Sequence, residues 1–154
     1  MAFLGAPDRA FLLSSLPGRE LDVARLRALA AGGLDWAALE SAARATGVVP
    51  ILANALEAVG PEAPVPADVA DRLRSALEQN AARNALLARE LTEIDAALRA
   101  DGIEAVALKG AALVALDEAY APLRSMSDVD LLVPADAGDA VLATLGRSGL
   151  VTVG

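Results

Sequence analysis

Residues 103–133, IEAVALKGAALVALDEAYAPLRSMSDVDLLV, contain two apolar segments that are separated by a glycine turn, a short helix and a loop. The first segment, residues 103–108, alternates and then becomes apolar, which is typical of a strand with one buried face. Residues 111–116 have the composition of a short helix, and a proline-containing loop follows them. The second segment, residues 129–133, is the clearest strand in the chain, and Pro134 ends it. The pattern predicts an α+β fold whose sheet begins in this region.

Two aspartates, Asp128 and Asp130, stand at the head of the second strand. Residues i and i+2 of a strand project to the same face, so we expect the two carboxylates to project together. Their mutual repulsion is relieved if a divalent cation or an arginine neutralises them, and Mg²⁺ binds carboxylate and phosphate oxygens. The alternative is a pair of solvated charges at a turn. Arg124 and Ser127 lie just upstream and have the same two interpretations. They could contact a ligand, or they could be ordinary polar residues of a solvated loop.

Lys109-Gly110-Ala111 lies between the first strand and the short helix. Glycine permits close approach to the backbone, and the free N–H groups at a helix start attract phosphate. Lys109 is the one lysine in the chain, since the other basic residues are arginines. The alternative is a tight turn with a solvated lysine. The segment does not match the P-loop pattern, because it has no second glycine at the required spacing and no Ser or Thr after the lysine.

The residues before this region predict helices. Apolar residues recur at helical spacing and are separated by Gly and Pro breakers. The helices are expected at residues 8–16, 19–31, 36–46, 48–59 and 68–100, and a further helix is expected at residues 136–145 after the second strand. A proline-rich linker at residues 60–66 separates two parts, an N-terminal helical region over residues 1–66 and a second part over residues 67–154. Leu150–Val153 could begin a third strand.

Asn80 and Asn84 interrupt the apolar stripe of the long helix. Two interpretations are open, because apolar residues are expected at both positions. The asparagines could mark a hydrated gap or a local kink, or they could face a polar cleft.

Composition excludes several kinds of chemistry. The chain has 154 residues, a net charge of -8, no cysteine and no histidine. These absences exclude a disulfide scaffold, a thiol nucleophile, a Ser-His-Asp triad and histidine metal sites. A pI near 4.5 argues against broad, charge-driven binding of nucleic acid. No segment has the length of a membrane span or the pattern of a signal peptide, so we expect a soluble, cytoplasmic protein.

The two motifs taken together carry a resemblance. The segments Leu108-Lys109-Gly110-Ala111-Ala112-Leu113 and Leu123-Arg124-Ser125-Met126-Ser127-Asp128-Val129-Asp130-Leu131-Leu132-Val133 resemble the nucleotidyltransferase fold of the DNA polymerase β superfamily. Within it, they are similar to a family that has a helical N-terminal half and whose members mostly lack an assigned substrate. The likeness is specific over residues 103–133 and weaker in the helices. Residues 67–154 would then comprise a long helix and a partial nucleotidyltransferase core.

The resemblance implies a magnesium-dependent transfer of a nucleotide monophosphate from an NTP such as ATP to a hydroxyl group. Asp128 and Asp130 would be the catalytic and metal-binding residues. Gly110 and Ala111 would approach the β- and γ-phosphates through backbone N–H groups, and Lys109 or Arg124 would supply a cation. Ser127 is assigned to the nucleotide-binding residues as well. The acceptor would be a small molecule or a protein rather than a nucleic acid.

Two features depart from the superfamily pattern. Its usual Gly-Ser is Gly110-Ala111 here, and no third carboxylate follows on a later strand, because Asp136 and Asp139 fall in a predicted helix. We therefore expect a core truncated after the second strand, with impaired or absent catalysis. Its exposed sheet edge would favour pairing with another copy of the chain. The alternatives are a non-catalytic nucleotide-binding relic and a helical interaction module.

Overall fold

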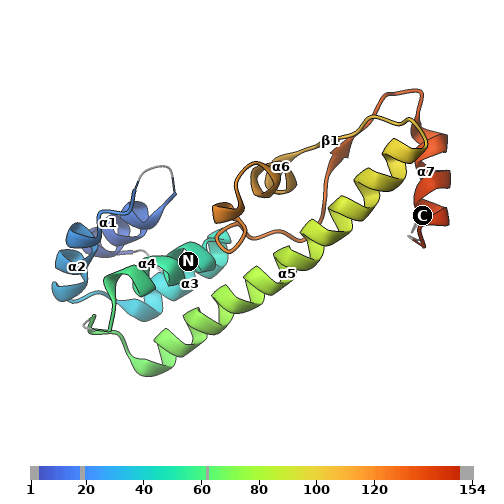
Figure 1. Ribbon diagram of the computed structural model, residues 1–154. Helices are drawn as coiled ribbons and strands as arrows, with labels where there is room; N and C mark the ends of the chain where they lie inside the picture. The colour runs from blue at the N-terminus through green and yellow to red at the C-terminus, as the bar shows by residue number, and fades with distance from the viewer. Residues whose placement is uncertain (1–3, 18–19, 62, 150–154) are drawn as a thin grey trace. The chain divides into compact units, whose positions relative to one another are not determined.

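The computed structural model describes residues 4–17, 20–61 and 63–149 (Figure 1). It confirms an α+β fold, in which helices precede a small antiparallel sheet. Contacts divide the chain into two units. The first, here called the helical unit, contains the residues up to Ala81 together with Pro122–Ser125. The second, the sheet unit, contains Ala82–Ala121 and the residues from Met126 onward. The predicted division at residue 66 stays a prediction.

The helical unit begins with four short helices. They are α1 (Ala6–Ser15), α2 (Val23–Ala31), α3 (Trp36–Thr46) and α4 (Val49–Val59). Asp22 and Asp35 cap α2 and α3, since each carboxylate accepts a backbone N–H three residues ahead, at 2.9 Å. The cap explains why α2 starts at Val23, four residues later than predicted. The prediction for α3 is confirmed at both ends.

The core of the helical unit is built from aliphatic side chains around one aromatic pair. Phe11 and Trp36 meet edge to face, with ring centroids 5.4 Å apart. Leu39 and Leu52 are fully buried beside them, and the first half of α5 (Ala67–Ala100) adds Leu73. Alanines fill much of the remaining core, so the helices can approach closely without large side chains.

Glu40 of α3 carries a buried charge in this unit. Its side chain is 10% exposed, and Arg72 of α5 donates to Oε2 at 2.8 Å while Arg44 donates to Oε1 at 2.7 Å. The hydrogen bond from Arg72 is the main cause that lowers the pKa of Glu40 to about 2. The network therefore ties α3 to α5 through a carboxylate that is charged throughout the physiological range.

The two asparagines of α5 bind backbone carbonyl groups. In the helical unit, Asn80 Nδ2 donates to the carbonyl oxygens of Pro122 at 2.8 Å and Arg124 at 3.2 Å. In the sheet unit, Asn84 Nδ2 donates to the carbonyl oxygen of Ala121. Both side chains are buried, so a hydrated gap at these positions is wrong. Each buried amide instead donates to carbonyl groups of the loop that contains Pro122.

The sheet unit holds the second half of α5 and the elements that follow it. These are β1 (Val106–Ala107), α6 (Lys109–Leu116), the 3-10 turn η1 (Glu118–Tyr120), β2 (Leu131–Leu132) and α7 (Gly138–Arg147). The strands pair antiparallel, with Val106 opposite Leu132. Both are shorter than predicted, because the flanking residues leave the ladder for the α6 turn and for Pro134. The predicted third strand at residues 150–153 lies outside the described residues.

Helix α7 is attached to the turn that ends α5. The Thr144 hydroxyl and the Arg147 guanidinium both donate to the carboxylate of Asp101. Gly102 beside it has a φ of 71°, a left-handed conformation that ends the long helix. Within the part of the chain that is described, no helix is both long and apolar enough to cross a membrane.

The Glu40 network predicts a specific acid sensitivity. A carboxylate whose pKa is lowered on folding contributes stability that is present above its unfolded pKa of about 4.5. That contribution is lost as the pH falls from 4.5 toward 2. Glu40→Gln should therefore cost about 3 kcal/mol of unfolding free energy at pH 7, and much less near pH 2.

Urea unfolding at a series of pH values measures this difference. Asp68→Asn is the control, because Asp68 also pairs with Arg72 but is 70% exposed, so its loss should be far smaller. Equal pH profiles for the wild type and Glu40→Gln would contradict the assignment.

Candidate functional site

The site is built on the register of the two strands. Val106 faces Leu132 and Ala107 faces Leu131, and the Leu108 N–H donates to the carbonyl oxygen of Asp130 at 2.9 Å. Because the strands are antiparallel, the end of β1 and the start of β2 meet at the same edge of the sheet. The register therefore brings the Lys109-Gly110 turn against the residues that begin β2.

One ion pair joins the two predicted motifs. Lys109 Nζ lies 3.0 Å from Asp130 Oδ2, with the lysine side chain 70% exposed and the aspartate side chain 35% exposed. Sequence reasoning assigned both residues to the site but did not predict their contact. The antiparallel pairing could have indicated it, since it places residue 108 opposite residue 130.

Lys109 also has an unusual backbone conformation. Among the described residues it is the non-glycine residue with a positive φ, 51°. A left-handed conformation costs a residue with a Cβ about 1 kcal/mol, and such strain gathers at functional sites. The strained position is thus the residue that contacts Asp130, and not the neighbouring glycine.

Gly110 and Ala111 lie in the first turn of α6, which starts two residues earlier than predicted. Both residues are buried, and Ala111 is 3% exposed. Local packing is therefore one reason for small residues at these two positions, and close approach of a ligand would be another. The first backbone N–H groups of a helix have no partner within the helix, and the role of these donors toward a phosphate stays a prediction.

Three further predicted residues have contacts of other kinds. Ser127 Oγ donates to Asp128 Oδ1 at 3.3 Å, and both residues are exposed, so the serine does make a local contact beside the aspartate. Arg124 belongs to the helical unit, where its carbonyl oxygen accepts from Asn80. The roles of these three residues toward a nucleotide or metal stay predictions. Within residues 4–17, 20–61 and 63–149, no cluster of three acidic side chains could hold a metal ion.

The two faces of the strand pair differ. Alternation from the register places Val106, Leu108, Asp130 and Leu132 on one face, here called the carboxylate face. Val106 and Leu132 are each 58% exposed, so this face is open in the described structure. The other face contributes Ala107 and Leu131 to a cavity of about 310 Å³ that Thr92 and Asp95 of α5 also line. Asp130 therefore does not belong to that cavity.

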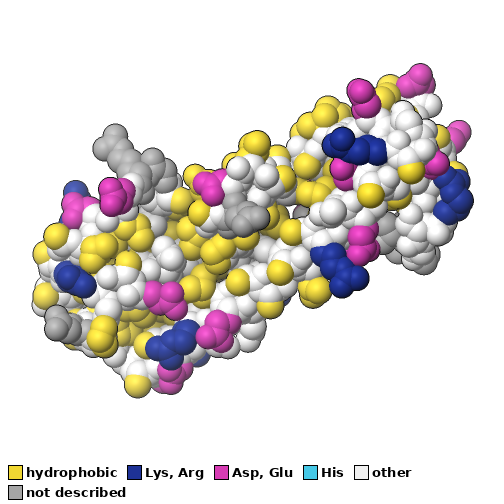
Figure 2. Space-filling view, in the orientation of Figure 1, with side chains coloured by type: hydrophobic (Ala, Val, Ile, Leu, Met, Phe, Trp, Pro, Cys, Tyr) yellow, Lys and Arg dark blue, Asp and Glu magenta, His cyan; other side chains and the backbone are white. Residues whose placement is uncertain are grey.

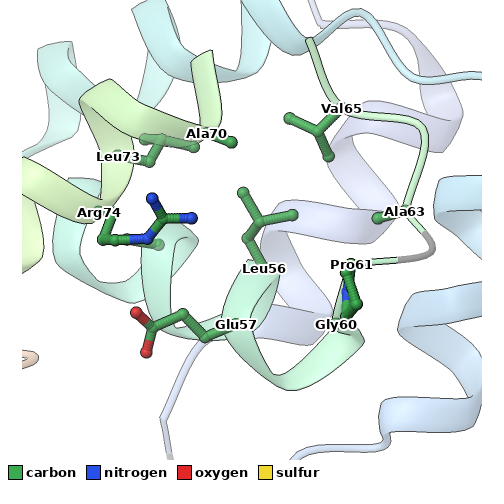
Figure 3. Close-up of a pocket in the computed structure, with 10 residues that line it drawn as sticks. Leu56, Glu57, Gly60, Pro61, Ala63, Val65, Ala70, Leu73 and Arg74 are labelled. Carbon is green, nitrogen blue, oxygen red and sulfur yellow. The ribbon is translucent and has the colours of Figure 1, made fainter. Parts of the chain in front are cut away.

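A second cavity lies in the helical unit (Figure 3). It has a volume of about 330 Å³ and is lined mainly by apolar residues of α4, α5 and the linker between them. Glu57 and Arg74 extend over it from α4 and α5. The lining contains none of the predicted site residues, so this cavity gives no support to the predicted chemistry.

The backbone strain at Lys109 can be measured from the unfolding free energy of variants. Lys109→Gly should leave the unfolding free energy unchanged or raise it by up to about 1 kcal/mol, because glycine adopts positive φ freely and an exposed ion pair contributes little. Gly102→Ala calibrates the cost, since φ there is 71° and nothing lies within 4 Å of an added Cβ. That variant should lose about 1 kcal/mol. A loss of more than 1 kcal/mol in Lys109→Gly would show that the lysine is retained for stability.

Comparison with known proteins places the chain in a family. The family model described as "Uncharacterised nucleotidyltransferase" matches residues 32–154, which include the last helices of the helical unit and the whole of both motifs. No curated protein and no solved structure matches the chain significantly. Because the family model covers most of the chain, the resemblance seen in the two motifs is confirmed. The chain belongs to this family of uncharacterised nucleotidyltransferases.

Proposed function

We propose that the chain binds an NTP with Mg²⁺ and transfers the nucleotide monophosphate to a hydroxyl group of a small molecule or protein. The observation that carries the proposal is the contact between the two motifs, in which Lys109 at the helix start meets Asp130 at the strand start. The proposal requires a turn that binds phosphate and carboxylates that bind metal, and this contact joins the two segments that would supply them.

The carboxylates suit a hard divalent cation. Asp128 is exposed and Asp130 is partly exposed, so both are accessible from solvent, and carboxylate oxygens are the ligands that Mg²⁺ prefers. Asp128 and Asp130 would hold the ion. Bound there, Mg²⁺ would neutralise charge that develops on the phosphate oxygens during transfer.

The residues of the chain would bind and orient the triphosphate. The first-turn N–H groups of α6 would donate to the phosphate oxygens, and Lys109 would add a positive charge beside them. The acceptor oxygen would form a bond to the α-phosphorus while the bond from that phosphorus to the pyrophosphate oxygen breaks. The acceptor loses its proton to solvent or to a nearby base. Arg124 and Ser127 are proposed as further nucleotide contacts.

Surface charge favours a small molecule or protein as the acceptor. The net charge is -8, and in Figure 2 the basic side chains are interspersed with acidic ones without forming a continuous basic surface on this face. A long nucleic acid gains most of its affinity from many phosphate contacts with Lys and Arg. The surface in view does not provide them.

A second candidate is a nucleotide-binding protein without transfer activity. It is favoured by Ala111, which removes a hydroxyl from the turn, and by the absence of a third clustered acid among the described residues. Transfer of label from an α-labelled NTP to any acceptor in a cell extract would separate the two functions. Binding without transfer would favour this second candidate.

Nucleotide binding tests what both functions share. Calorimetric titration of ATP, GTP, CTP and UTP should show binding that depends on Mg²⁺ for at least one nucleotide. Asp128→Asn combined with Asp130→Asn should weaken that binding at least about tenfold, because a metal bridge to the phosphates is lost.

A matched control uses two other acids of the sheet unit. Asp136→Asn with Asp139→Asn changes the net charge by the same amount, at exposed positions before and within the first turn of α7. It should leave binding unchanged. Binding that is independent of Mg²⁺, or equal losses in the two double variants, would count against the proposed metal site.

A further inference from the structure

The starting observation is that Asp130 already has a cationic partner. Lys109 Nζ lies 3.0 Å from Asp130 Oδ2. A carboxylate proposed to bind Mg²⁺ thus carries a contact with an ammonium group. The ammonium and a divalent cation on the same carboxylate would be close neighbours of like charge, so the two contacts oppose each other.

The backbone of Lys109 is strained beside this contact. Its φ of 51° is a conformation that glycine would adopt at lower cost, and Gly110 stands directly beside it in helical conformation. The Leu108 N–H bond to the Asp130 carbonyl fixes the register on the other side. The lysine that contacts Asp130 therefore stands at a strained position of the turn.

We infer that Lys109 is an exchangeable counter-ion, which balances Asp130 while the site is empty and moves to the triphosphate when metal and nucleotide bind. The inference rests on the proposed function. The side chain of Lys109 is 70% exposed, so the pair is weakly held and can open without breaking a packed core. A triphosphate bound at the start of α6 would offer the ammonium several negative oxygens in exchange for one carboxylate.

The exchange would couple the two ligands. Metal alone has to displace Lys109 from Asp130 without giving it a new partner. Metal with nucleotide provides that partner, so each ligand should strengthen binding of the other. Lys109 is thus a positioning residue that disfavours metal binding in the absence of nucleotide, in addition to the phosphate contact expected from the sequence.

Binding of Mn²⁺ alone, measured from the electron paramagnetic resonance signal of the free ion, tests this role without turnover. Lys109→Met keeps an unbranched side chain of similar length and removes the charge. It should bind Mn²⁺ about threefold to tenfold more tightly than the wild type, because the competing ammonium is gone. Lys109→Arg should stay near the wild type.

Arg99→Met is the matched control. Arg99 also pairs with an aspartate of the sheet unit, Asp95, at 2.8 Å, and the two side chains are 75% and 40% exposed. The variant changes the net charge by the same amount at a nearly equivalent ion pair. Its affinity for Mn²⁺ should not change.

The second measurement is nucleotide affinity in saturating Mg²⁺, where Lys109→Met should bind about threefold to tenfold more weakly than the wild type. If the lysine only supports the fold, one variant is not expected to bind Mn²⁺ more tightly and nucleotide more weakly. Lys109→Gly gives the same test in a backbone without strain, should the methionine variant fold poorly.

Three outcomes overturn the inference. Unchanged or weaker Mn²⁺ binding in both Lys109→Met and Lys109→Gly shows no competition at Asp130. Equal tightening in Lys109→Met and Arg99→Met assigns the effect to net charge. In both cases, nucleotide binding that depends on Mg²⁺ would leave the proposed function standing. If neither Mn²⁺ nor any nucleotide binds to the folded wild type or the variants, the inference and the proposed function both fail.

Discussion

The antiparallel register of β1 and β2 is the constraint on which the site depends. The hydrogen bond from the Leu108 N–H to the Asp130 carbonyl places the glycine turn beside Asp130. A slip of one residue would turn Asp130 to the opposite face, toward the cavity lined by Ala107 and Leu131. The aspartate would then lose both its exposure and its contact with Lys109.

A tight hairpin turn does not set this register, because α6, η1 and a loop separate the strands. Long connections leave pairing weakly specified unless other contacts restrain them. The asparagines of α5 provide such restraints on successive turns of one helix. Asn84 holds the Ala121 carbonyl in the sheet unit, and Asn80 holds two carbonyls of residues 122–124 in the helical unit. Each asparagine therefore restrains a part of the connection within its own unit.

Much of this architecture could be predicted from local patterns. Breakers and capping aspartates locate the helices, as the exact match of α3 shows, and strand alternation locates the centres of β1 and β2. The exceptions depend on long-range contacts. The partners of Asn80 and Asn84 lie about forty residues away, and the partner of Lys109 lies across the sheet, so neither periodicity nor composition could identify them. For the same reason, the sequence indicated functional roles for Lys109 and Asp130 but did not indicate that the two side chains form an ion pair.

The Lys109–Asp130 pair balances charge at the sheet edge, where the metal site is proposed. Two carboxylates at the start of a strand repel each other, and a nearby cation reduces that repulsion. Lys109 reduces part of that repulsion. Because the ion pair is exposed, it contributes little free energy, and the contact can open at little cost. Glu40 shows the contrasting arrangement in the same chain, since two arginines bind a carboxylate that is 10% exposed and lower its pKa to about 2. Burial of the Glu40 carboxylate makes the loss of an arginine partner costly, whereas the exposure of the Lys109–Asp130 pair makes its opening cheap, as the proposed exchange requires.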